Sequence, residues 1–295
     1  MRSGSSGVGL PTGVKRWPAD QTRAVDDRPE PTVFDLAADR YHQARPRYPD
    51  ALFETLFERI GRTGVLDILE IGPATGVATE QLAARGHRIT AIEPGPRLVE
   101  AARRNLTDWP VVHIVEGSFE TWEPPRWGSF DAVVAATSWH WLDPDVAFTR
   151  AHRHLRPGGH LAFWSATHVL PDGGDPIFRD LQEVYDDIGE GLPPDAAFPA
   201  PGELADEHDA VEASGLFTVA AIEHHDWRTE HDAESYIDLL RTFSGHITMA
   251  PWQQERLFGA IRDRLAERPD GLLHRHWGAV LHVARARDPR PERVA

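Results

Sequence analysis

An alternation of strand and helix patterns between residues 65 and 166 most constrains the fold of this 295-residue chain. The segment VLDILEI at 65–71 is a nearly continuous apolar run, typical of a strand buried on both faces of a parallel sheet. We predict strands at 65–71, 87–93, 111–117, 130–136 and 160–166. This pattern predicts an α/β fold with a Rossmann-like, doubly wound sheet.

The last third of the chain departs from this alternation. Two further strand patterns, at 216–227 and 277–286, enclose helix patterns at 232–244 and 252–267. We therefore expect a seven-stranded sheet, mostly parallel, with a C-terminal antiparallel strand pair. The segment 186–210 is acidic, contains no Lys or Arg, and is predicted to be a loop.

The length is sufficient for one large domain. The first residues are rich in Gly, Ser and Pro and offer little to bury, so we expect a disordered leader there. We divide the chain into a leader at 1–30, a single domain at 31–288 and a tail at 289–295. Within the domain we expect N-terminal lid helices at 31–60, a cofactor-binding core at 65–166, and acceptor-side helices with the last two strands at 167–288.

The composition argues against several classes of partner. Lys and Arg number 31 against 46 Asp and Glu, a formal net charge of −15 that would repel a phosphate backbone. Cysteine is absent, which fits a reducing compartment, and no apolar run approaches the roughly 20 residues of a membrane helix. We expect a cytoplasmic protein without nucleic-acid or membrane partners; the sequence leaves the oligomeric state open.

The segment LEIGPATGVAT at 69–79 links the first strand to a helix, a turn at which α/β sheets bind ligands. A dinucleotide fingerprint would place glycines where Ala74 and Val77 stand, which argues against NAD and FAD. Glu93 follows Gly72 by 21 residues, the spacing of an acid that binds ribose hydroxyls. Together these residues predict a nucleoside ligand that lacks a pyrophosphate.

Five motifs occur in a familiar order: LEIGPATG, AIEPG, EGSFE, FDAVVAATSWHWLDP and LRPGGHLAFW. In this order they resemble the class I S-adenosylmethionine-dependent methyltransferases, in particular the small-molecule, type-11-like group. The segment YHQARPRYP resembles the N-terminal lid of some of these enzymes. The specific resemblance covers residues 33–166 and implies S-adenosyl-L-methionine as the cofactor.

The resemblance implies which residues bind this cofactor. Glu93 would hold the ribose, and the backbone at Ala135 would face the methionine amino group. Ala74 and Ser118 depart from the glycine and aspartate more common in the family. The implied cofactor-binding set is Tyr41, Arg45, Glu70, Gly72, Ala74, Thr75, Gly76, Glu93, Pro94, Ser118, Phe119 and Ala135.

His140 follows the fourth strand at the edge where the transferred methyl group would lie. It could accept a proton from an acceptor hydroxyl or amine. The alternative is a structural histidine packed between tryptophans, since transfer to a carboxylate needs no base. For the acceptor we single out Arg47, Trp139, Trp164 and His246. Arg45 and Arg47 could grip the cofactor carboxylate or an anionic acceptor.

The predicted function is S-adenosylmethionine-dependent methyl transfer to a small-molecule acceptor by in-line displacement, at an O, N or C atom. One alternative is a related protein that binds the cofactor without transferring methyl. Another, a nucleotide-linked oxidoreductase, is disfavoured by Ala74. The histidine pairs His224–His225 and His274/His276 lack a third ligand at defined spacing, so no metal is expected.

Overall fold

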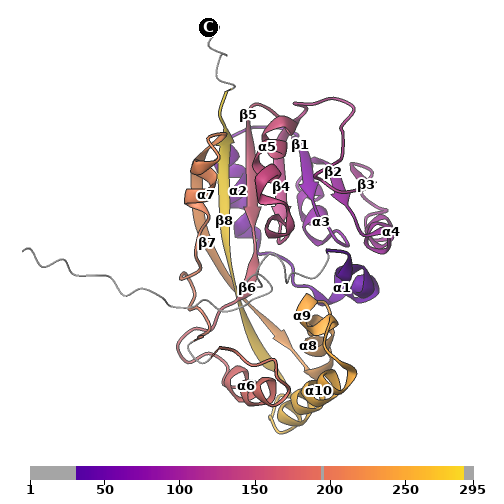
Figure 1. Ribbon diagram of the computed structural model, residues 1–295, viewed down its shortest axis with the longest axis vertical. Helices are drawn as coiled ribbons and strands as arrows, with labels where there is room; N and C mark the ends of the chain where they lie inside the picture. Colours follow the sequence, from indigo (N-terminus) through magenta and orange to yellow (C-terminus); the bar gives the residue numbers. More distant parts are fainter. Residues whose placement is uncertain (1–30, 194–195, 289–295) are drawn as a thin grey trace, which may run out of the picture.

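The computed structural model describes residues 31–193 and 196–288, so the predicted leader and tail lie outside the described residues. One mixed sheet runs through the described part in the order β3-β2-β1-β4-β5-β8-β6, with β7 paired to β8 (Figure 1). Strands β1 to β5 are parallel, and β8 is antiparallel to its neighbours. The predicted fold class is confirmed. The strands are β1 (Asp67–Ile71), β2 (Arg88–Glu93), β3 (Val112–Glu116), β4 (Phe130–Ala136), β5 (Leu155–Trp164), β6 (Ala166–His168), β7 (Phe217–His231) and β8 (Leu273–Ala286).

The described sheet has eight strands where seven were predicted. The run predicted as one strand at 160–166 is divided after Trp164, and the short β6 pairs with β8, from Ala166 opposite Ala279 to His168 opposite Trp277. An apolar run shows that a segment is buried, but it does not show which neighbour the segment pairs with.

Helices cover both faces of the sheet. Apolar residues of α2, α3 and α4 pack on one face, and those of α5 and α7 pack on the other. The described helices are η2 (Pro31–Ala37), α1 (Ala38–Ala44), α2 (Asp50–Ile60), α3 (Val77–Ala83), α4 (Pro96–Asn105), η3 (Trp139–Trp141), α5 (Pro144–His154), α6 (Ile177–Asp187), α7 (His208–Ala213), α8 (Ala233–Leu240), α9 (Ser244–Ile247) and α10 (Pro251–Ala266).

Strands β7 and β8 extend beyond the rest of the sheet into a helical lobe, which we define as α6, α8, α9, α10 and the paired segment from Trp227–Trp277 to His231–Leu273 (Figure 1). This lobe has its own apolar core. Both strands are longer than predicted. The end of β7 gave a weak apolar signal in the sequence, because one face of this strand is partly exposed and its last residues are polar. The extension places a second body beside the carboxyl edge of the parallel strands.

Helix α2 belongs to the core and does not form part of a lid. Leu52, Phe53 and Leu56 are fully buried against the sheet. The prediction of lid helices over 31–60 was therefore too broad, because α2 buries one apolar face against the sheet. Only the segment 31–48, called the lid segment below, remains as a candidate cover for the site.

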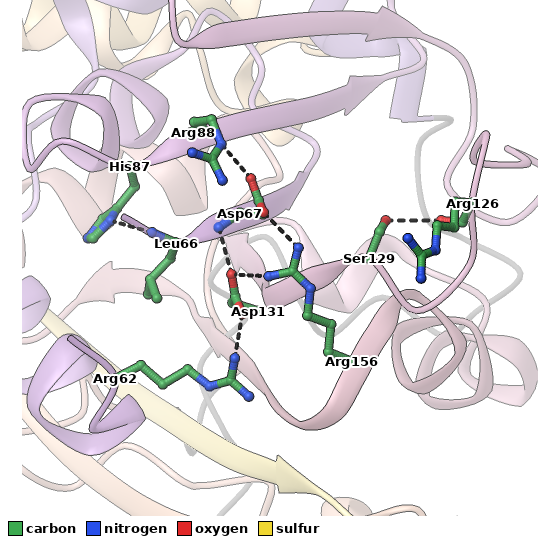
Figure 2. A network of polar contacts seen from close by, with 9 residues as sticks. All are labelled: Arg62, Leu66, Asp67, His87, Arg88, Arg126, Ser129, Asp131 and Arg156. Carbon is green, nitrogen blue, oxygen red and sulfur yellow. Dashed lines mark hydrogen bonds and ion pairs between the residues drawn. The ribbon is translucent and has the colours of Figure 1, made fainter. Parts of the chain in front are cut away.

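A polar network joins the strands at their amino ends (Figure 2). Asp131 accepts hydrogen bonds from the Asp67 backbone N–H at 2.9 Å and from Arg156 Nη1 at 2.6 Å, and it also pairs with Arg62. Asp67 accepts from Arg88 Nε and Arg156 Nη2, both at 2.7 Å. The hydrogen bond from Arg88 is the main reason that the pKa of Asp67 is lowered. Each carboxylate at this end thus has two arginine partners.

Candidate functional site

A cavity of about 700 Å³ lies at the opposite, carboxyl end of the strands and continues into the helical lobe. One half is formed by the loop after β1 and the ends of β2 and β4, and the other half is formed by the lobe. Of the residues predicted to bind cofactor or acceptor, ten line this cavity: Tyr41, Arg45, Gly72, Ala74, Glu93, Pro94, Ser118, Phe119, His140 and His246.

The loop after β1 depends on two glycines. Gly72 and Gly76 have positive φ angles of 60° and 94°. A Cβ atom at Gly72 would lie 2.8 Å from Ser138 Cβ, and one at Gly76 would lie 2.6 Å from Leu106 Cδ1. Both positions therefore need glycine for backbone conformation and for space. The resulting tight turn brings Gly72 and Ala74 to the wall of the cavity.

Ala74 keeps the left-handed conformation of the glycine that it replaces, with φ 50°. This conformation costs an alanine roughly 1–2 kcal/mol. Its methyl group packs with Phe34 against a small cluster of Ala38, Leu98 and Ala101. The alanine thus supplies a contact between the cofactor loop and the lid segment that glycine would lack.

Glu93 ties this loop to the end of β2. It is 5% exposed and accepts hydrogen bonds from the backbone N–H groups of Ala74 and Gly95, each at 3.0 Å. Burial raises its pKa to about 7. Among the described residues no basic side chain pairs with it, so its carboxylate is available to hydroxyl donors of a ligand.

Glu70 lies deeper, on a smaller cavity of about 50 Å³ below the loop. It is fully buried, and neither carboxylate oxygen has a hydrogen-bond partner among the described residues. Burial raises its pKa to about 7, and the nearby Glu93 raises it further. The nearby Thr79 side chain opposes this rise in pKa, and among the described residues no basic side chain pairs with Glu70.

The lid segment also contacts the cofactor half through polar side chains, among them those of Asp35 and His42. Asp35 Oδ1 accepts a hydrogen bond from Leu98 N at 2.9 Å and so caps α4, whose own N-cap residue is Gly95. His42 Nδ1 lies 3.1 Å from the Thr75 carbonyl. Thr75 itself is fully buried and does not line the cavity.

Arg45 joins the lid segment to the helical lobe. Its Nε donates to Thr242 Oγ1 at 2.9 Å and its Nη2 donates to the Thr242 carbonyl at 2.7 Å. The guanidinium also lies 4.8 Å from the Tyr41 ring centroid and 4.3 Å from that of Phe243. Arg45 therefore lies on the cavity wall between the two halves.

Pro94, Ser118 and Phe119 line the part of the cavity beside the ends of β2 and β3. Ser118 Oγ donates to Glu120. Phe119 is 3% exposed and presents an apolar surface there. These three residues, predicted from the sequence to surround an adenine, thus lie together on one part of the cavity wall.

Thr137 lines both cavities and was missed by the sequence analysis. It is a β-branched residue with φ 57°, a conformation that signals local strain and is frequent at functional sites. Its Oγ1 lies 2.8 Å from Tyr48 OH and accepts from Ala166 N at 3.2 Å. Its position directly after the fourth predicted strand was the available signal.

His140 lies on η3 and lines the cavity. Its Nδ1 is 3.3 Å from Ser165 Oγ, and its ring is tilted 45° against that of Trp141. The structure thus places the histidine beside the cavity and not within the sheet core.

Trp139 and Trp164, predicted as walls of the acceptor site, do not line the cavity. Trp139 stacks on Phe163 with ring centroids 5.0 Å apart on one face of the sheet. Trp164 is 1% exposed and packs edge-on against Tyr48 and Phe53 on the other face. Both predictions were wrong, because these side chains complete the apolar layers on either face of the sheet.

Two further predicted residues also lie off the cavity. Arg47 is exposed, pairs with Glu80 and does not line either cavity. The Ala135 side chain is fully buried in the sheet, and the following residues Ala136 and Thr137 line the smaller cavity instead. Gly76 does not line the larger cavity either, and its positive φ angle shapes the turn after β1.

The lobe half of the cavity is largely aromatic. His246 lines it, with Nε2 2.8 Å from Tyr185 OH, and burial raises the pKa of that tyrosine well above its ordinary value. The other aromatic residues lining this half are Phe178, Phe198, Tyr236, Phe243 and Trp277. We call this half the aromatic chamber.

Residues 31–193 and 196–288 lack two kinds of feature. They contain no group of three His, Cys, Asp or Glu side chains placed to hold a metal ion. Within the same ranges, no helix has the length and apolar character needed to cross a membrane.

Fold and cavity together define a Rossmann-like methyltransferase architecture. The structure resembles a proposed type II methyltransferase from Anaeromyxobacter dehalogenans, with a TM-score of 0.55 and 22% identity, covering 82% of this chain and 97% of that one. Residues 69–163 match the family described as a methyltransferase domain. The chain is 27% identical over 236 residues to an uncharacterized methyltransferase of Mycobacterium tuberculosis, covering 80% of this chain and 86% of the relative.

A second relative, an uncharacterized methyltransferase of Bacillus mycoides, is 29% identical over 150 residues, which cover 50% of this chain and 61% of the relative. Residues 69–163 thus match a methyltransferase domain, as the motifs predict, and the chain is similar over 80% of its length to a relative named as a methyltransferase, which implies S-adenosylmethionine as methyl donor.

Proposed function

We propose that the chain transfers the methyl group of S-adenosylmethionine to a small-molecule acceptor held in the aromatic chamber. The observation that carries this proposal is the continuity of one cavity from Glu93 to the chamber. Its volume of about 700 Å³ lies within the range of small-molecule sites. A donor and an acceptor bound in the two halves would meet near Thr137 and His140.

In the cofactor half, each residue has a role that its environment supports. Glu93 would accept hydrogen bonds from the ribose hydroxyls, and Pro94, Ser118 and Phe119 would surround the adenine. Glu70 would lie beneath the methionine portion. Bound there, the cofactor supplies a sulfonium-activated methyl group.

The chain's own contribution is alignment and exclusion of water. In the displacement, the acceptor atom forms a bond to the methyl carbon while the bond from that carbon to sulfur breaks. Where the acceptor atom carries a proton, His140 would receive it, held in place by Ser165. The lid segment, fixed by Asp35 and Arg45, would cover the two ligands.

Isothermal titration calorimetry with S-adenosylhomocysteine, followed by transfer from methyl-labelled cofactor to a panel of phenols, carboxylic acids and amines, tests this function. We expect binding and labelling of at least one panel member. A folded protein that binds no S-adenosylhomocysteine contradicts the proposal. Binding without labelling of any member favours a cofactor-binding protein that does not transfer methyl.

A further inference from the structure

The aromatic chamber contains one buried arginine that its surroundings leave without a counter-ion. Arg275 is 8% exposed and lines the cavity. Its Nη1 donates to Tyr236 OH at 3.1 Å, whereas its Nε has no hydrogen-bond partner. No carboxylate of the described residues forms an ion pair with it.

Aromatic rings surround this guanidinium. Its Cζ lies 4.3 Å from the ring centroid of Trp277, 5.4 Å from that of Phe243 and 5.9 Å from that of Tyr236. Rings attract a cation, but they leave its hydrogen-bonding capacity unused. A buried guanidinium with an unused N–H donor is unfavourable unless an anion completes it.

The acidic residues nearby are engaged elsewhere. Asp175, at the start of α6, accepts from Arg268 and from the His274 backbone N–H. Glu190 also lines the cavity, but it is exposed and lies 3.3 Å from Gln253 Nε2. Neither pairs with Arg275, which therefore has no carboxylate partner among the described residues.

The strand register fixes how far this charge lies from the cofactor half. Ala279 of β8 pairs with Ala166, whose N–H donates to Thr137 at the end of β4. Arg275 lies four residues before Ala279 on the same strand, about 13 Å away at the rise of an antiparallel strand. A molecule that extended from Arg275 to the region of Thr137 would be elongated.

We infer that Arg275 binds the carboxylate of the methyl acceptor, and that the acceptor is an elongated molecule with an aromatic or acyl body between this carboxylate and the methylated atom. A carboxylate matches the planar donor fork of one arginine, whereas a phosphate dianion would exceed its single charge. This inference rests on the proposed function, because it names the acceptor for the same cavity. Arg45 is distinct, since two of its nitrogens already donate to Thr242.

Calorimetry of full-length protein saturated with S-adenosylhomocysteine tests this inference. The probes are 4-hydroxycinnamate, 4′-hydroxybiphenyl-4-carboxylate and 10-hydroxydecanoate, each compared with its uncharged primary amide. We expect the longer carboxylates to bind at least 10-fold more tightly than their amides. In Arg275→Met this preference should disappear while the affinity for S-adenosylhomocysteine stays within threefold of wild type.

Arg150→Met provides a matched control. Arg150 is also largely buried, has an unpartnered Nε and lies over an aromatic ring, but it does not line the cavity. This variant should keep the carboxylate preference. Equal binding of acids and amides by the wild type, or a preference retained in Arg275→Met, overturns the inference. Failure of the wild type to bind S-adenosylhomocysteine would instead reject the proposed function. If Arg275→Met does not fold, Arg275→Lys, which retains the charge, replaces it in the comparison.

Discussion

The two ends of the central strands differ in whether their carboxyl groups have basic partners. At the amino end, Asp67 and Asp131 are paired with arginines (Figure 2), and the pKa of Asp67 is lowered by its hydrogen bond to Arg88. At the carboxyl end, Glu70 and Glu93 have no basic partner among the described residues, and burial raises the pKa of each to about 7. The paired end stabilises the fold, whereas the two unpaired carboxyl groups lie at the end where we propose that the ligands bind.

Glu93→Ala tests the carboxyl end most strongly. Two charge-assisted hydrogen bonds to ribose hydroxyls would be lost, so we expect the affinity for S-adenosylhomocysteine to fall by about 1,000-fold, on the order of 4 kcal/mol. Calorimetry measures this change, and circular dichroism checks that the variant is folded. Glu116→Ala is the control, because Glu116 lies opposite Glu93 on β3, is exposed and does not line the cavity. Similar losses in both variants would contradict the assigned role.

Asp131→Asn tests the amino end. The variant leaves Arg62 and Arg156 without their shared buried partner, so we expect the free energy of unfolding to fall by about 3 kcal/mol. Urea denaturation measures this change, and the affinity for S-adenosylhomocysteine should stay within threefold of wild type. Glu100→Gln removes only an exposed helix pair with Arg104 and should cost less than about 0.5 kcal/mol. If Asp131→Asn lost as much affinity for S-adenosylhomocysteine as Glu93→Ala, the proposed difference between the two ends of the strands would be contradicted.

Glu70→Gln adds a pH dependence to the comparison. The folded protein keeps a proton on Glu70 up to about pH 7, whereas the unfolded chain releases it near 4.5, so the free energy of unfolding falls as the pH rises between these values. Glutamine removes this contribution. At pH 8 we expect the free energy of unfolding of the ligand-free variant to exceed that of wild type by about 2 kcal/mol. The full pKa shift of Glu70 corresponds to roughly 3 kcal/mol, and the gain is smaller because the glutamine amide is also buried. Urea unfolding at pH 4.5 and 8 measures it, and a difference independent of pH would contradict the assignment.

Ala74→Gly should have the smallest effect. Relief of the left-handed conformation, about 1–2 kcal/mol, opposes the lost methyl contact of about 0.8 kcal/mol and the extra freedom of the unfolded chain. We expect the free energy of unfolding to change by less than about 1 kcal/mol. Ala78→Gly, in the buried first turn of α3, has no such strain to relieve and should cost more. Equal costs at both positions would show that Ala74 is not strained.

The sequence predicted the turn after β1 and the position of Glu93 beside it, because the signals for both are local. A turn between a buried strand and a helix, with glycines at Gly72 and Gly76, has few conformations available to it. The spacing to Glu93 then follows from one helix and one further strand. His140 was predicted beside the cavity for the same reason, since it follows a strand whose carboxyl end lies at the same edge.

The aromatic chamber could not be predicted in this way. Trp139 follows β4 as His140 does, and Trp164 ends the neighbouring strand β5, yet each packs into a different apolar layer. Which side chain faces a cavity depends on strand pairing and local bends, such as the break after Trp164, and these are set by partners distant in sequence.

The sequence by itself thus determined the α/β class and placed the glycine turn after β1 beside Glu93, because these follow from periodicity and spacing within short segments. Only the tertiary structure decided that β7 and β8 extend into a helical lobe, that Ala74 contacts the lid segment, and that Arg275 lies unpaired among aromatic rings. The register of two strands more than forty residues apart brings Arg275 to the cavity, and no local pattern encodes that register.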